Sequence, residues 1–177
     1  DTSAALLISR TDEARKILEK KGWVYNEDKK VMEKKSQNQT IALEFALSTS
    51  NAPELKKAAE IIKEEWEKIG AKVEIKLFEP GDLNQTVIRP RKYDALLFGE
   101  IIGRDLDLFA FWHSSQRNDP GLNIAMYANV KTDKLLETAR SASTKEKRIE
   151  EYQAFEKEIQ KDVPAVFTYS PDFIYII

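Results

Sequence analysis

The sequence predicts an α/β fold, and three observations carry that prediction. Residues 40–48 and 71–78 each alternate apolar and polar side chains, which is typical of strands with one buried face. Between them, apolar residues recur at three- and four-residue spacing, a helical period that begins near Pro53 and ends before Gly70. A strand, a helix and a strand within about forty residues indicate a βαβ unit with parallel strands and a right-handed crossover.

The residues before this unit predict one helix and one hairpin or loop. Thr11 is a good N-cap for a helix, and Gly22 suits the position after its last residue. The polar, turn-rich residues 24–39 then predict a hairpin or an exposed loop around Val31 and Met32.

The residues after the unit predict a short helix and a further strand. Gly81–Asp82 can cap a short helix that stops at Pro90, and the nearly continuous apolar run 93–102 predicts a central strand buried on both faces. An aromatic-rich short helix or turn over 105–112 and a polar loop over 113–123 follow. Further helices and strand-like segments complete the prediction: helices 132–142 and 145–162, strand-like segments 164–169 and 173–177.

The chain is predicted to be a single α/β domain over residues 1–177, because it contains no linker, low-complexity tract or long repeat. It starts without methionine and ends on the apolar residues Phe173 to Ile177. Natural C-termini rarely stop inside an apolar strand. The expectation is therefore a piece of a larger protein.

Composition excludes several classes of protein. Lys and Arg total 28 against 30 Asp and Glu, a net charge of −2, which argues against a basic face that binds nucleic acid. No stretch approaches 18 uncharged apolar residues, so no transmembrane helix is predicted. Cysteine is absent and histidine occurs once, which excludes thiolate sites and zinc sites built on paired histidines. No metal or cofactor is predicted.

Motifs for catalysis are also sparse. Asp105 and Asp107 resemble half of a metal-binding loop without further ligands, and helix capping explains them more simply. His113 beside Ser114 and Ser115 invites a catalytic interpretation, but a nucleophile also needs an orienting group and an oxyanion pocket. A small hydrolase-like enzyme that uses Asp105, Asp107 or His113 remains an open alternative.

Trp112 has two interpretations of similar weight. It can pack in a small core with neighbouring aromatic residues, or it can stack on a ligand. Position slightly favours the ligand, because residues 99–113 leave the carboxyl end of a predicted strand, where open α/β sheets bind ligands.

The order of motifs resembles the family 5 extracellular solute-binding proteins, the oligopeptide-, dipeptide- and nickel-type receptors of ABC importers. Each piece is weak alone, but their order and spacing together are specific. The matching pieces run from Asp12 through Gly-Trp23, the strand before Asn51, Ala58-Ala-Glu-Ile-Ile, Trp66 to Glu74, Tyr93-Asp-Ala-Leu-Leu-Phe-Gly99, Asp105 to Phe109, Trp112-His-Ser-Ser, Asn123, Tyr127-Ala-Asn129, Asp133-Lys-Leu-Leu, Arg148 before Tyr152, and Asp162 to Tyr169.

This resemblance implies the third lobe of a clamshell receptor: a periplasmic-binding-protein-like α/β lobe with a mixed sheet, a βαβ unit and helices on both faces. It implies half of a cleft for a peptide, an oligosaccharide or a similar small solute. The other half belongs to the missing lobe I, and the closed receptor is presented to an ABC permease in the membrane. The implied location is periplasmic or on the cell surface, with a lipoprotein anchor as one form.

Two departures from the family pattern concern the ligand. Gly99 matches the family's Gly-Trp pair, but Glu100 replaces the tryptophan. Gly103 or Arg104 stands where peptide-binding members place an aspartate, while Asp105 matches the following Asp-Pro motif with Leu106 in place of proline. Both departures argue against a peptide as the ligand. The Glu100 carboxylate suits a cationic group or a sugar hydroxyl.

The expected function is therefore a non-enzymatic solute-binding lobe. Backbone and side-chain hydrogen bonds are expected from residues 99–105, stacking from Trp112, and ordering of the loop from His113 and Asn123. The candidate ligand-binding residues are Gly99, Glu100, Ile101, Ile102, Arg104, Asp105, Trp112, His113 and Asn123. A protein-interaction domain in which residues 99–113 pack as core is the second open alternative, beside the enzyme.

Overall fold

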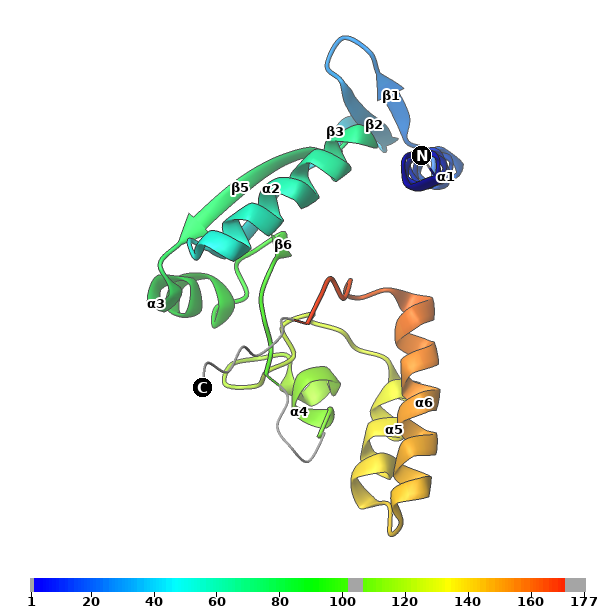
Figure 1. Cartoon of the computed structure of the whole chain (residues 1–177), viewed down its shortest axis with the longest axis vertical. Coiled ribbons are helices and arrows are strands. Elements are labelled where there is room, and N and C mark those ends of the chain that lie inside the picture. The colour runs from blue at the N-terminus through cyan, green and yellow to red at the C-terminus, as the bar shows by residue number, and fades with distance from the viewer. Residues whose placement is uncertain (1, 102–106, 171–177) are drawn as a thin grey trace. The chain divides into compact units, whose positions relative to one another are not determined.

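The computed structural model of the chain describes residues 2–101 and 107–170, and Figure 1 draws its helices and strands. These residues form two compact units, one that ends at Glu100 and one that begins at Ile101. The first unit contains two three-stranded sheets, and the described part of the second is built from helices. The single lobe over residues 1–177 stays a prediction, since one lobe can hold two compact units.

The first helix is longer than the sequence indicated. Helix α1 spans Thr2–Lys20, so Thr11 lies in its interior and is not its N-cap. The preceding residues include Ala4, Ala5 and Leu6, which are strong helix formers and extend the helix upstream. Its predicted end is confirmed, because Gly22 follows with a φ of +85°, a conformation that glycine adopts without strain.

The predicted hairpin over residues 24–39 is confirmed, but it is not an exposed loop. Strands β1 (Val24–Asn26), β2 (Val31–Ser36) and β3 (Gln39–Ala42) form an antiparallel sheet. Val31 and Met32 are 4% and 1% exposed, respectively. The Met32 N–H donates to the Gly70 carbonyl at 2.7 Å, which ties this sheet to the end of the next helix.

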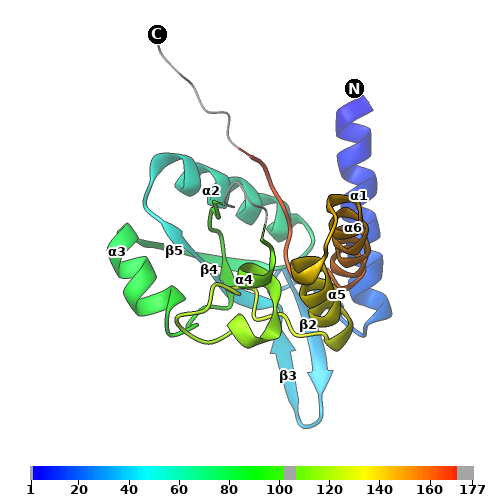
Figure 2. The same cartoon turned by 90° about the horizontal axis from the view of Figure 1, so that it is seen from below.

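The predicted βαβ unit is confirmed. Strand β4 (Glu44–Ser50) pairs in parallel with β5 (Lys72–Phe78), and helix α2 (Pro53–Lys68) connects them, as Figures 1 and 2 show. Helix α2 begins at Pro53, and Gly70 follows its end with a φ of +88°. The predicted strand over 40–48 is divided at Leu43, because its first part pairs with β2 in the other sheet.

The predicted central strand over 93–102 is wrong in length and place. Among the described strands, β6 is Ala95–Leu96 and lies at the edge of a sheet whose order is β5-β4-β6. The ladder ends there because the Thr49 hydroxyl donates to the Leu97 carbonyl at 2.8 Å, while the Leu97 N–H donates to the Ser48 carbonyl. Strand β4 takes the centre, since its five residues Ala46–Ser50 are all buried.

Helical segments cover both faces of this sheet, as the fold class requires. On one face Leu47 and Val73 pack against Ala59 of α2. Successive strand residues point to opposite faces, so Ser48 lies on the other face, near Val87. That second face is covered by α3 (Pro80–Asp82) and the π-helical segment η1 (Leu83–Ile88), which start at Pro80 and not at the predicted Gly81–Asp82 cap.

The second unit confirms the predicted helices. They are α4 (Phe109–Trp112), α5 (Val130–Ser141) and α6 (Lys145–Asp162). The 3₁₀ segment η2 (Ser114–Gln116) lies in the stretch predicted as a polar loop and was not predicted. Helix α5 begins two residues earlier than predicted because the Asn129 side chain accepts a hydrogen bond from the Lys131 N–H. Helices α5 and α6 pack side by side (Figures 1 and 2) around Leu136 and Phe155.

The predicted strand over 164–169 is absent from the described residues, where this segment has no regular structure. A strand requires a neighbouring ladder of N–H and C=O groups. The residues described between 107 and 170 contain no other strand to provide one. The segment 173–177 lies outside the described residues. Within the part of the chain that the structure describes, none of the helices has the length and apolar content needed to cross a membrane.

Candidate functional site

The first part of the candidate site is the carboxyl end of β6. Register pairs Ser48 with Leu96, so the residues that follow β6 lie beside the end of the central strand β4. Gly99 and Glu100 are exposed, and Ile101 is 92% exposed. A side chain built at Gly99 would meet no atom within 4 Å. Three predicted ligand residues therefore lie in the open at the edge where parallel sheets bind ligands.

Two polar residues that the sequence analysis missed lie at the same edge. Asn51 directly follows β4 and Glu79 directly follows β5, and both are exposed. The Asn51 side-chain amide donates to the Glu79 carboxylate, and its backbone N–H donates to the Phe78 carbonyl at 2.8 Å. A polar residue immediately after each strand of a βαβ unit is a pattern from which both could have been predicted.

Glu100 has a shifted acidity. Desolvation raises the pKa of its carboxyl to about 7, whereas the residue is exposed by surface area. Water that reaches the side chain favours the charged form. The Glu100 carboxyl therefore protonates more easily than that of an ordinary glutamate.

Three predicted ligand residues, Ile102, Arg104 and Asp105, lie outside the described residues. Their contacts with a solute stay predictions from the sequence.

The structure packs Trp112 as a core side chain. It is 7% exposed, and its ring lies 6.5 Å from Tyr127, 6.1 Å from Phe155 and 6.0 Å from Phe167, measured between centroids. The rings of Tyr127 and Phe155 meet it edge to face, a favourable arrangement of ring quadrupoles. The described contacts are therefore those of a side chain packed in a small core. Stacking of Trp112 on a ligand stays a prediction.

His113 caps the 3₁₀ segment η2, and its ring stacks on a neighbouring aromatic ring. Its Nδ1 accepts a hydrogen bond from the Ser115 N–H at 3.1 Å, at the start of η2, and its ring stacks on Phe109 at 4.1 Å. Because Nδ1 accepts, the neutral ring carries its proton on Nε2. Nε2 is buried without a hydrogen-bond partner among the described residues, 3.4 Å from the Glu137 carboxylate and 3.9 Å from that of Asp133.

Asn123 is completely buried, and its side chain connects to the backbone of the other predicted residues in this unit. Its Nδ2 lies 3.1 Å from the Trp112 and His113 carbonyls and 3.0 Å from the Tyr127 carbonyl. Its Oδ1 accepts from the Tyr127 N–H at 3.2 Å. The predicted role of Asn123 in ordering the loop therefore has a direct geometric basis, since one side chain links residues 112–113 to residue 127.

The residues of the enzyme alternative have structural partners. The Asp107 carboxylate pairs with Arg140 at 2.8 Å and accepts from the Phe109 N–H at 3.2 Å. His113 is occupied by Ser115 through Nδ1, and Asp105 lies outside the described residues. Over residues 2–101 and 107–170, no group of three His, Asp or Glu side chains is placed to hold a metal ion.

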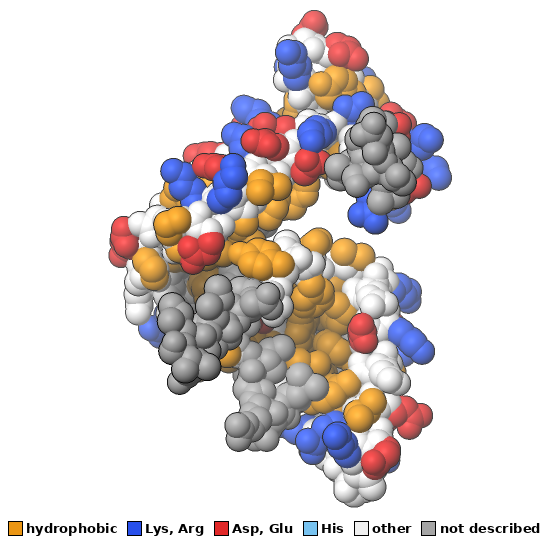
Figure 3. Space-filling model, viewed as in Figure 1, with side chains coloured by type: hydrophobic (Ala, Val, Ile, Leu, Met, Phe, Trp, Pro, Cys, Tyr) orange, Lys and Arg blue, Asp and Glu red, His pale blue; other side chains and the backbone are white. Residues whose placement is uncertain are grey.

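Charge is mixed over the visible surface. On the face drawn in Figure 3, Lys and Arg side chains alternate with Asp and Glu side chains. Helix α2 illustrates the pattern with ion pairs between Lys57 and Glu60 and between Lys63 and Glu67. This face offers no broad basic surface for nucleic acid, in keeping with the overall charge of −2.

Comparison with known proteins places these features in context. The family model described as bacterial extracellular solute-binding proteins, family 5 Middle, matches residues 5–121. The oligopeptide-binding protein AppA of Bacillus subtilis (strain 168) is 27% identical over 161 residues, which is 90% of this chain and 29% of that protein. The chain thus spans less than a third of the length of this relative.

Solved structures show the same fold. The Bacillus subtilis AppA structure, in complex with a nonapeptide, matches with a TM-score of 0.78 and 26% identity over 86% of this chain and 30% of that chain. The structure of NikZ from Campylobacter jejuni, in complex with Ni(L-His), matches with a TM-score of 0.74 and 28% identity over 87% of this chain and 30% of that chain.

Proposed function

Because this chain belongs to the bacterial extracellular solute-binding proteins of family 5, we propose that it forms one side of the solute-binding cleft in the receptor of an ABC importer. The other side is supplied by a lobe I that this chain does not contain. Closure of the two lobes around the solute desolvates it on both sides and presents the receptor to its membrane permease.

The observation that carries this proposal is the open carboxyl end of β6. Gly99 leaves room for the backbone to approach a solute, and Glu100 offers a carboxylate beside it. Ile101 adds an apolar side chain that is 92% exposed. Burying such a side chain under a second lobe would contribute about 1.5–3 kcal/mol to closure. Asn51 and Glu79 add polar groups at the neighbouring strand ends.

The remaining predicted residues divide into two groups. Ile102, Arg104 and Asp105 follow in the sequence and are proposed as further solute contacts. Trp112, His113 and Asn123 are proposed to support the site by holding the segment that follows, because they are at most 9% exposed and the Asn123 amide donates to the Trp112 and His113 carbonyls.

The proposed ligand is a peptide, an oligosaccharide or a similar small solute. A carboxylate at the cleft wall favours a solute with an ammonium group or several hydroxyl groups, since both donate hydrogen bonds to it. The proposed location is outside the cytoplasmic membrane, in the periplasm or on the cell surface as a lipoprotein.

The test uses the full-length receptor and this chain in parallel. Mass spectrometry of the full-length receptor, purified with its bound solute, identifies the ligand. Isothermal titration calorimetry then measures the affinity of that ligand for the receptor and for the 177-residue chain. We expect the chain alone to bind no more tightly than about 1 mM, because half of the desolvating surface is missing.

Variants assign the contact to Glu100. In the full-length receptor, Glu100→Gln is expected to weaken binding by about tenfold, the size of one charge-assisted hydrogen bond. Glu64→Gln, at an exposed position on α2, is the matched control and should leave the affinity unchanged. Micromolar binding by the 177-residue chain alone, or a receptor without any solute affinity, contradicts the proposal.

A further inference from the structure

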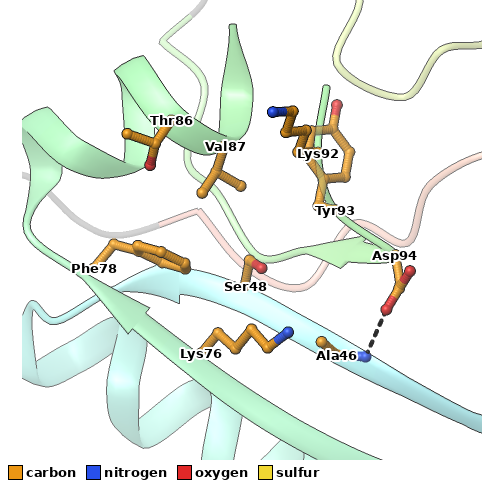
Figure 4. A pocket seen from close by; sticks show the side chains of 9 residues that line it. All are labelled: Ala46, Ser48, Lys76, Phe78, Thr86, Val87, Lys92, Tyr93 and Asp94. Carbon is orange, nitrogen blue, oxygen red and sulfur yellow. Dashed lines mark hydrogen bonds between the residues drawn. The ribbon is translucent and has the colours of Figure 1, made fainter. Parts of the chain in front are cut away.

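A separate pocket opens on the face of the parallel sheet that carries Ser48. It has a volume of about 310 Å³, close to the lower end of the usual range for ligand pockets. Its walls come from β4, β5, η1 and the residues that lead into β6 (Figure 4). All of them belong to the first compact unit.

The pocket gathers hydrogen-bond donors from distant parts of the chain. Lys76 and Lys92 contribute ammonium groups to the lining, and Ser48 contributes a hydroxyl group. Figure 4 draws one hydrogen bond among the nine lining residues, from the Ala46 N–H to the Asp94 carboxylate, at 3.0 Å. Ser48 and Lys76 pair across β4 and β5, so their side chains share one face of the sheet, yet neither donor has a partner among the lining residues.

Ser48 shows that this space is built into the fold. The residue is 3% exposed, yet its hydroxyl points into the pocket in Figure 4. The hydroxyl is therefore the part of this buried residue that faces the pocket, where a bound group can accept a hydrogen bond from it.

Charge and shape define what fits. Lys76 and Lys92 outweigh Asp94, whose carboxylate is already held by the Ala46 N–H. Lys76 also forms an ion pair with the exposed Glu74 carboxylate, at an N···O distance of 3.8 Å. An anion that binds closer to the Lys76 ammonium group can replace this weak partner. Phe78 and Val87 add apolar surface to the lining of the pocket.

We propose that this pocket binds a small organic anion with one carboxylate attached to a flat apolar body. The carboxylate lies beside the Lys76 ammonium group and accepts from the Ser48 hydroxyl, the two residues that pair across β4 and β5. Lys92 adds positive charge to the lining, and the apolar body packs against Phe78. The pocket lining and the predicted solute contacts are made of different residues, since Lys92–Asp94 precede β6 and Gly99 follows it. The proposal is thus independent of the solute-binding function.

The test is a titration of the 177-residue chain with benzoate, followed by NMR of its backbone amides. Benzamide, which has the same shape without the charge, is titrated in parallel. We expect saturable shifts of the Ser48, Lys76 and Thr86 amides with a Kd on the order of 1–10 mM for benzoate. Benzamide should bind at least about fivefold more weakly, because the ammonium groups act only on the anion.

Variants separate the pocket from general attraction of anions to lysines. Lys76→Gln is expected to weaken benzoate binding about fivefold, and Ser48→Ala about threefold. Lys57→Gln on α2, which removes an exposed lysine outside the pocket, should have no effect. Unchanged amides outside the pocket verify that each variant is folded. Equal affinity for benzamide, absence of saturation, or equal losses in Lys57→Gln and Lys76→Gln would overturn the proposal.

Discussion

Replacement of Asn123 by alanine is expected to destabilise the second compact unit by more than a typical substitution. The side chain is completely buried and reaches three carbonyls, those of Trp112, His113 and Tyr127. It also accepts from the Tyr127 N–H. This combination sets the orientation of the amide, because three acceptors face Nδ2 and one donor faces Oδ1.

The magnitude follows from the number of bonds. Nδ2 has two hydrogens for its three carbonyls, so the network amounts to about three full hydrogen bonds at about 1 kcal/mol each. Asn123→Ala should therefore lower the free energy of unfolding by about 3 kcal/mol. With a urea m-value of about 2 kcal/mol/M, the midpoint falls by about 1.5 M.

Asn123→Asp sharpens the test, since it changes one atom of the side chain. An ionised aspartate cannot donate to the Trp112, His113 and Tyr127 carbonyls, so at pH 7 it should cost more than alanine. Burial raises the pKa of the new carboxyl above its unfolded value of about 3.9. The excess cost is therefore present at high pH and declines as the pH falls through the folded pKa, when the protonated acid can donate one bond.

The assay is urea denaturation at several pH values, each variant compared with the unchanged chain at the same pH. Hydrogen exchange resolved by mass spectrometry locates the loss in residues 107–170. Asn118→Ala, at an exposed position in the same loop, is the control and should change stability by less than about 0.5 kcal/mol. A loss below about 1 kcal/mol for Asn123→Ala, or a cost of Asn123→Asp that grows on acidification, would refute the reasoning.

Two further outcomes test other parts of the fold. Tyr127→Phe removes the phenol that donates to Asp162 at 2.7 Å and holds the pKa of that carboxyl below its usual range. In the variant, the Asp162 pKa should rise toward its ordinary value in an NMR titration. The unchanged chain loses stability as the pH falls through the folded pKa of Asp162, and this loss should be smaller in the variant. An unmoved pKa would show that the Tyr127 phenol does not lower it. Gly70→Ala is expected to cost about 1–3 kcal/mol in urea denaturation, because φ is +88° and the new Cβ would lie 2.9 Å from Met32. Gly81→Ala, whose Cβ would meet nothing within 4 Å, should be nearly neutral, and equal costs at the two positions would contradict this explanation.

Local signals were sufficient for the helices and for the βαβ unit. Pro53 and Gly70 bound α2 because proline fits the first turn and glycine alone adopts a positive φ without strain. The alternating residues of β4 and β5 report a buried face directly. The prediction that α1 begins after Thr11 was wrong, because a residue that favours the N-cap is also tolerated inside a helix.

The candidate site was predictable in position but not in the role of each residue. The carboxyl end of β6 follows from strand order along the chain, and Gly99, Glu100 and Ile101 are exposed there. The packing of Trp112 depends on Phe155 and Phe167, which are far away in the sequence, and stacking of Trp112 on a solute stays a prediction.

By itself, the sequence determined the α/β class, the parallel βαβ unit and the family, because periodicity, capping and motif order are properties of neighbouring residues. Only the tertiary structure decided that β4 and not the apolar run 93–102 is central in the described sheet, since burial on both faces depends on what packs against a strand. It also decided that Asn123 lies among backbone carbonyls, and that Ser48 and Lys76 share a pocket with Lys92. Those groupings arise from contacts between residues distant in the chain, for which no local pattern provides a signal.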